Sequence, residues 1–264
     1  MSNRAVSMFI PHGGGPMPLL NAPSHQGIIE FLTGKARTLL GSPKAIVLVT
    51  AHWEEHVPTI SSAEKHSLLF DYYGFPDEAY QVEYPAKGSP SVAEQVKLAL
   101  SKQGFDAKLN DKRGWDHGVF VPLVLLVPDA NIPIVQLSVL KSQSAEEHIK
   151  MGRALSSLRD ENIAILGSGM SFHNMRAIFD QITVEDNTPF EDAIQDACES
   201  IGLERDEKLR NWEKFNGARY AQPVGYAEHF MPLLVAAGAG GDSKGKSVAR
   251  LLFKEFAVSA YVWS

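Results

Sequence analysis

The chain has 264 residues, of which 44% are hydrophobic and 21% charged, a balance typical of a globular protein with an ample core. It excludes a disordered chain, a collagen and a coiled coil. The formal net charge of −6 offers no basic surface, so neither nucleic acid nor an anionic membrane is expected as a partner. The single cysteine, Cys198, excludes an intrachain disulfide and a thiolate metal site. We see no cleavable leader and no bilayer-length apolar stretch, and we therefore predict a cytoplasmic protein.

The first part of the chain alternates apolar runs with segments of helical spacing. Strands are predicted over residues 5–10 and 45–51, and the second of these has no polar alternation, as expected for a strand covered on both faces. Helices are predicted over residues 27–40 and 90–103, with Ser89 as the N-cap of the second. This order of elements is typical of an α/β protein.

The alternation continues through the middle of the chain. Residues 119–126 are apolar, but their pattern does not distinguish a helix from a strand. Strands are predicted over residues 132–140 and 162–166, with helical spacing between them over residues 144–159. Glycines at both ends of residues 167–169 predict a turn after the last of these strands.

The last part of the chain is less regular. A polar helical region is predicted over residues 188–215 and an apolar helix over residues 230–237. Glycines then predict a flexible loop over residues 238–241, and one or two edge strands are predicted over residues 247–263. Since no repeat or linker interrupts the chain, we expect one domain over residues 1–264.

Five of the nine histidines occupy positions that suggest a shared site. His12, His52 and His173 each follow a predicted strand, and the carboxyl ends of parallel strands meet at the edge where α/β sheets bind ligands. His117 neighbours a glycine and an apolar run, and His229 stands where a loop becomes an apolar helix, so both can join that edge. Imidazole is the commonest ligand of zinc, iron, copper and nickel, and the pattern therefore predicts a metal centre.

The remaining histidines and the glycine-rich loop have simpler interpretations. We expect His25, His56, His66 and His148 to be solvated, because they lie in polar or helical-surface contexts. Residues 13–15 are glycines followed by proline rather than by the Lys-Ser/Thr of a phosphate-binding loop. Their backbone either lies close to a bound metal or substrate or makes an ordinary turn. The chain also lacks the Gly-x-Ser-x-Gly elbow of serine hydrolases.

Several motifs in order along the chain together resemble the LigB-type extradiol ring-cleavage dioxygenases, within them the 4,5-DOPA dioxygenase-like group. The matching segments are PHGGGP at 11–16, VTAHW at 49–53, DYYGFP at 71–76, YPAKGSP at 84–90, WDHG at 115–118, IVQLS at 134–138, GSGMSFHN at 167–174 and EHFMPLL at 228–234. Each is weak alone, but their combination is specific and covers most of the chain. Pro11 departs from the pattern, because a small residue often precedes the first histidine there.

The resemblance implies a single α/β domain with a mixed, mostly parallel central sheet flanked by helices. It also implies a non-haem Fe(II) centre that opens a catechol ring beside its two hydroxyls with O₂. By motif, His12, His52 and His229 correspond to the metal ligands. His173 corresponds to an acid/base group or a further metal-site residue, and His117 to a group that contacts the substrate or supports the ligands. The expected partners are a small-molecule catechol and O₂, and a homo-oligomer is left open.

The chemistry agrees with this assignment but leaves alternatives. Three histidines from separate loops leave neighbouring positions on a metal for a catecholate and O₂. A nitrogen-only site would also hold Zn²⁺ well, so a zinc hydrolase with His173 or Glu228 as base is the second hypothesis, and a non-catalytic binding protein is the third. Relatives with a carboxylate as third ligand place an acid where this chain has His229. Glu228 is adjacent, but consecutive residues at a helix start diverge by about 100°, so we do not expect Glu228 and His229 both to reach the metal.

Two further features have paired interpretations. A catechol must lose a proton to chelate a metal, and His173 and His117 are the candidate bases. Asp116 either orients an imidazole or caps a turn, and we favour the turn. The rings of Tyr72, Tyr73 and Phe75 line the substrate site or belong to the core.

Overall fold

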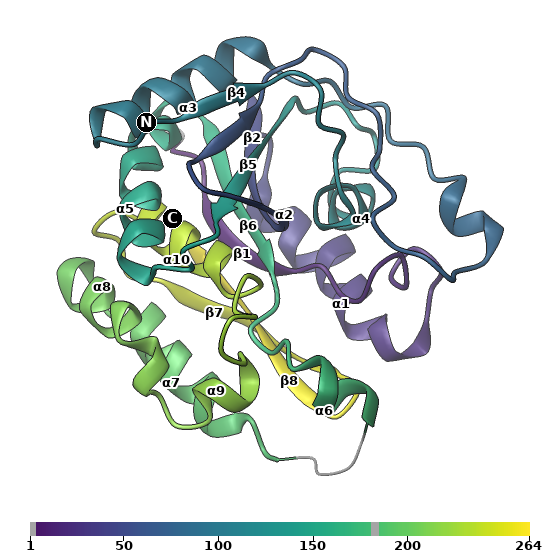
Figure 1. The fold of residues 1–264 in the computed structure, drawn as a ribbon, viewed down its shortest axis with the longest axis vertical. Helices are drawn as coiled ribbons and strands as arrows, with labels where there is room; N and C mark the ends of the chain where they lie inside the picture. Colours follow the sequence, from purple (N-terminus) through teal and green to yellow (C-terminus); the bar gives the residue numbers. More distant parts are fainter. Residues whose placement is uncertain (1–3, 181–184) are drawn as a thin grey trace.

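The computed structural model describes residues 4–180 and 185–264 (Figure 1). Within them, eight strands form one sheet in the order β4-β3-β5-β2-β6-β1-β8-β7. The strands are β1 (Ser7–Pro11), β2 (Ala45–Glu55), β3 (Thr59–Ser61), β4 (Lys108–Asn110), β5 (Ile134–Leu140), β6 (Ile163–Gly169), β7 (Lys246–Phe253) and β8 (Phe256–Trp263).

Helices cover both faces of the sheet (Figure 1). In the described residues they are α1 (Gln26–Phe31), α2 (Arg37–Leu40), α3 (Pro90–Lys102), α4 (His117–Leu126), α5 (Ala145–Leu155), α6 (Met175–Asp180), α7 (Thr188–Cys198), α8 (Gly202–Arg210), α9 (Ala218–Ala221) and α10 (Met231–Ala239). A π-helical turn, Leu32–Ala36, joins α1 to α2, and α4 packs against this turn on one face. On the other face α10 packs against α5, β6 and β1. No helix among these is both long and apolar enough to cross a membrane.

The sheet is mixed and mostly parallel, which confirms the predicted α/β fold class. Its centre is parallel, since β2 pairs in parallel with β5 and β6, and β6 pairs in parallel with β1. The terminal strands β8 and β7 extend it in antiparallel fashion beyond β1. Prediction missed β3 and β4, because segments of three residues carry no readable alternation.

Most predicted elements form, including the helix α3 with Ser89 as its cap, whose side chain accepts a hydrogen bond from the Val92 N–H. The undecided segment 119–126 is part of α4, which is apolar on all sides because it lies buried against β2 and β6. The predicted region 188–215 is divided into α7 and α8, since Gly202 adopts a φ of 55° between them. Of the two terminal strands, β8 is interior and β7 lies at one edge of the sheet, with β4 at the other edge.

Two glycine segments were interpreted wrongly. Residues 167–169 do not turn, because they are the last residues of β6 and pair with β1. Gly238 lies within α10 rather than in a loop. In both places glycine permits backbone contact: a Cβ on Gly167 would lie 2.2 Å from the Pro232 oxygen, and one on Gly238 would lie 2.3 Å from the Ile149 oxygen.

Two of the four histidines expected to be solvated are buried, so that prediction is wrong for them. The ring of His25 lies under the glycine-rich loop and accepts a hydrogen bond from the Gly14 N–H at 3.0 Å. His148 accepts one from the Leu140 N–H at 3.0 Å. Burial lowers the pKa of both to about 4, so both are neutral at pH 7. His56 is exposed as expected, and His66 is half-buried.

Candidate metal centre

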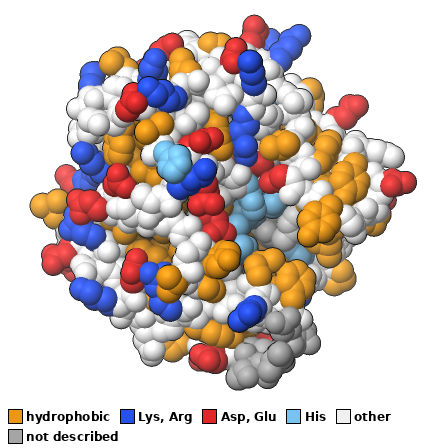
Figure 2. Space-filling model, in the orientation of Figure 1, with side chains coloured by type: hydrophobic (Ala, Val, Ile, Leu, Met, Phe, Trp, Pro, Cys, Tyr) orange, Lys and Arg blue, Asp and Glu red, His pale blue; other side chains and the backbone are white. Residues whose placement is uncertain are grey.

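Histidine side chains gather in a hollow at the carboxyl edge of the parallel strands, visible in Figure 2. His12 follows β1 directly, and His229 lies in the turn that leads into α10. His52 belongs to β2, at a point where the pairing with β5 shifts register between Thr50 and Glu54. This irregularity turns the strand locally, as bulges beside functional sites commonly do.

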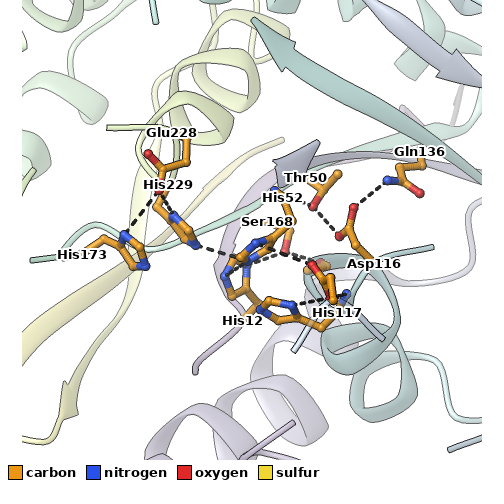
Figure 3. Close-up of polar contacts among 12 residues, drawn as sticks. His12, Thr50, His52, Asp116, His117, Gln136, Ser168, His173, Glu228 and His229 are labelled. Atoms are coloured by element: carbon orange, nitrogen blue, oxygen red, sulfur yellow. Dashed lines mark hydrogen bonds and ion pairs between the residues drawn. The ribbon is translucent and has the colours of Figure 1, made fainter. Parts of the chain in front are cut away.

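Three imidazoles converge through the same ring atom (Figure 3). The Nε2 atom of His52 lies 3.3 Å from that of His12 and 3.2 Å from that of His229. Nitrogen ligands about 2.0–2.1 Å from a zinc-sized ion stand roughly 3.0–3.4 Å apart, so this spacing fits a common metal. His12 and His229 are buried, while His52 is partly open to solvent.

Each of these three rings turns its other nitrogen towards an oxygen. The Ser168 hydroxyl donates to the Gly118 carbonyl and therefore accepts from His12 Nδ1–H at 3.0 Å. The Glu228 carboxylate accepts from His229 Nδ1–H at 2.8 Å. His52 Nδ1 lies 3.8 Å from Asp71 Oδ2. Protons at Nδ1 leave lone pairs at Nε2, so in His12 and His229 the converging atoms are the ones free to bind a metal.

The electrostatic surroundings keep the cluster neutral. Burial, followed by the neighbouring imidazoles, lowers the pKa of His12 and His229 well below the usual value. Burial likewise lowers the pKa of His52, and the carboxylate of Asp71 opposes that shift. Neutral imidazole is the form that ligates metals, so the donor set is ready at neutral pH.

The other two predicted residues flank the cluster. The ring of His173 stacks on that of His229, with centroids 3.4 Å apart and planes 15° apart. Its Nδ1 is buried, has no hydrogen-bond partner within residues 4–180 and 185–264, and lies 3.6 Å from Glu228 Oε1. Burial, followed by the charge of His117, lowers the pKa of His173 to about 4. The ring of His117 lies 3.8 Å from that of His52, on the opposite side of the cluster.

Sequence reasoning missed two residues that hold histidines in place. The Asp71 carboxylate accepts hydrogen bonds from His117, from Nδ1–H at 2.8 Å and from the backbone N–H at 3.0 Å. Glu228 precedes α10, and its carboxylate accepts a hydrogen bond from His229 Nδ1–H, on the side of that ring away from the converging Nε2 atoms. It supports His229 from outside the cluster, a role that the sequence did not indicate. Asp71 begins the segment DYYGFP, but nothing in that pattern assigns its carboxylate to His117.

Asp116 does neither of the things considered for it. It stands at the N-cap position of α4, yet its side chain makes no capping hydrogen bond. Its buried carboxylate instead accepts hydrogen bonds from Thr50 Oγ1 and Gln136 Nε2, each at 2.7 Å. It therefore ties α4 to β2 and β5 beneath the histidines, and the prediction of a turn cap is wrong.

The aromatic segment and the glycine loop meet beside the cluster. Tyr72 is half-buried, with its ring 5.9 Å from that of His117 and 5.4 Å from that of Phe75. A Cβ on Gly15, whose φ is 53°, would lie 3.3 Å from the Phe75 ring. Tyr73 is 91% exposed, so its ring does not pack with Tyr72 and Phe75 beside the histidines. Two of the three predicted rings thus lie near the site.

Comparison with known proteins connects the whole fold to one family. Residues 8–261 match the family described as the catalytic LigB subunit of aromatic ring-opening dioxygenase. The dioxygenase tasH of Hapsidospora irregularis is 42% identical over 264 residues, which cover 91% of this chain and 79% of that protein. The 4,5-DOPA dioxygenase extradiol of Portulaca grandiflora is 35% identical, over 94% of this chain and 90% of that protein.

A solved structure with a similar fold is also known. A crystal structure of an uncharacterised protein from Escherichia coli K12 superposes with a TM-score of 0.77 at 28% identity. The alignment covers 99% of this chain and 100% of that one. The likeness therefore includes the terminal strands as well as the strands that carry the histidines.

Proposed function

The chain belongs to the LigB family of extradiol, aromatic ring-opening dioxygenases, and we propose that it opens a catechol-type ring with O₂ at an Fe(II) ion bound by His12, His52 and His229. One observation carries the ligand assignment: three Nε2 atoms converge within 3.3 Å of their neighbours, while the Nδ1 atoms turn towards oxygens. Fe(II) supplies adjacent positions for the two catechol oxygens and O₂. We further propose that residues 1–264 act as one domain in the cytoplasm.

His173 is proposed as the acid/base group. Its imidazole is neutral at pH 7 and borders the open side of the cluster, so it is in the form that accepts a proton from a catechol hydroxyl. The alternative role as a fourth ligand is less well supported. The two stacked rings lie in nearly parallel planes, with centroids 3.4 Å apart, so lone pairs in the two ring planes do not readily meet at one metal position.

His117 is proposed as a contact for the substrate. The Asp71 carboxylate fixes its ring by accepting from Nδ1–H, so Nε2 is the ring nitrogen left for a substrate. The ring faces His52 and Tyr72, so its position suits a group that holds a substrate hydroxyl beside the metal.

The zinc hydrolase hypothesis requires a free base beside the metal. Of the two candidate bases, Glu228 is engaged, because its Oε1 accepts from His229 Nδ1–H at 2.8 Å. His173 is then the base left to this hypothesis, as it is to ring opening. The same donor set does suit Zn²⁺, so zinc is the expected contaminant of purified protein.

The test is anaerobic reconstitution of the purified chain with Fe(II), followed by O₂ and a panel of catechols. We expect a yellow ring-opened product that contains both atoms of isotopically labelled O₂. Product formation that requires no O₂, or ester and amide turnover by the zinc-loaded protein alone, would contradict the proposal.

A further inference from the structure

A groove leads away from the histidine cluster towards solvent. It has a volume of about 500 Å³ and is lined on one side by residues 173–176 and on the other by Pro223, Val224, Tyr226 and Glu228. A second hollow of about 340 Å³ contacts His52 and His229 and shares Tyr226 and Glu228 with the groove. The groove is therefore continuous with the mouth of the metal centre.

The groove is apolar over most of its length. Val224 is 73% exposed, Tyr226 68% and Met175 47%, although all three are large hydrophobic side chains. Its charged groups lie apart: Glu228 at the inner end is engaged by His229, and Arg176 contributes a cation from the surface of α6. Exposed apolar side chains gathered beside a site mark a place where something apolar binds.

The size of the groove exceeds what a bare catechol needs. Cavities of roughly 300–1,000 Å³ enclose ligands of drug size, whereas the ring to be opened must sit on the histidine cluster itself. The space beside His173 is therefore available for a substituent on the ring that is opened. Most of the surface in the groove is apolar, and two of its polar residues, Asn174 and Glu228, are already hydrogen-bonded to other residues. A polar amino-acid side chain would therefore lose water over most of the groove and meet Arg176 as its charged partner.

We propose that this groove binds the ring substituent of the substrate, and that the substituent is an extended apolar group such as a second aromatic ring. The proposal rests on the proposed function, because it presumes that a catechol is bound at His12, His52 and His229. Val224 and Tyr226 are then the residues that determine specificity, through contact with the substituent rather than with the reacting ring.

The test compares kcat/KM for 4-phenylcatechol, catechol and DOPA with the Fe(II)-loaded protein. Because one methylene in a hydrophobic pocket changes kcat/KM by about 10- to 200-fold, we expect 4-phenylcatechol to exceed catechol at least tenfold. In Val224→Asp this ratio should fall about tenfold. Anaerobic binding of 4-phenylcatechol to the zinc-loaded protein should weaken by a similar factor, which gives a readout independent of turnover.

Leu203→Asp is the matched control, because Leu203 is an apolar residue of α8 that is 81% exposed and lies outside the groove. It should leave the ratio unchanged. Equal kcat/KM for catechol and 4-phenylcatechol would overturn the proposal, as would a preference for DOPA that Arg176→Gln abolishes, since the groove would then bind a carboxylate. If no catechol is opened at all, the proposed function itself has failed, which is a different result.

Discussion

The two sides of the histidine cluster differ in how they are built. The inner side consists of buried residues at the ends of central strands, with His12 and Ser168 fully enclosed and Gly169 in direct contact with the backbone of His229. The outer side consists of connecting segments, where Val224 and Tyr226 are largely exposed. The inner side is therefore part of the core and carries the proposed metal ligands, while the outer side is exposed connecting chain, the kind of segment that commonly contacts a substrate.

The strongest test of the inner side is removal of a proposed ligand. His229→Ala should lose the metal and with it all measurable ring opening, because two imidazoles hold a divalent ion poorly. The parent should bind about one ion per chain, as measured by elemental analysis after dialysis. Full metal occupancy in His229→Ala would show that the third ligand is another residue.

Replacement of His173, which lies between the two sides, should lower the rate of ring opening without removing the metal. His173→Gln should retain the metal but lower kcat by on the order of 10² to 10⁴, the usual contribution of general acid–base catalysis. His117→Ala should act more mildly and mainly on KM. Loss of metal in His173→Gln would instead make His173 a fourth ligand.

The close backbone contact between Gly169 and His229 can be tested without replacing any proposed metal ligand. A Cβ on Gly169 would lie 2.2 Å from the His229 carbonyl oxygen, so Gly169→Ala must displace the start of α10. We expect a loss of stability of about 1–3 kcal/mol and weaker metal binding. Gly34→Ala is the control, because a Cβ there would meet nothing within 4 Å. Equal metal affinity in both variants would show that the close packing does not position His229.

The sequence predicted the convergence at the sheet edge better than it predicted the supports of the histidines. His12 and His52 could be placed because each follows a readable apolar strand. Asp71 could not, because it lies in a long connection between β3 and α3 that has no periodicity. Ser168 was assigned to a turn, since glycines that allow close packing of a helix on a strand look the same in sequence as glycines that turn the chain.

His25 shows a second limit of sequence reasoning. It stands between Ser24 and Gln26, a polar context that predicts exposure. It is buried because the glycine loop folds over it and the Phe253 ring packs against it, with centroids 5.0 Å apart. Both contacts come from segments that only the complete fold brings together.

Removal of the metal is expected to have the smallest effect on the fold. This experiment tests whether the inner side of the cluster stays folded without the ion. The Nδ1 protons of His12 and His229 are already bound by Ser168 and Glu228, and all three converging imidazoles have lowered pKa values, so without the ion the three rings are neutral and do not repel one another. A chain of this length also has enough core to fold alone. A chelator should therefore leave the far-UV circular dichroism of the protein unchanged at about 20 °C.

The apo-protein should still melt at a lower temperature than the metal-bound protein, because an ion that binds only the folded state stabilises it. At a metal concentration 100 times the Kd the shift should be about 5–10 °C, and it should vanish in His12→Ala. Val224→Asp, on the outer side, should keep the full shift, because Val224 contacts no proposed ligand. If chelation unfolds the protein, the metal is structural, and the ion rather than the sheet holds the inner side together. The inner side would then no longer differ from the outer side by being part of the core.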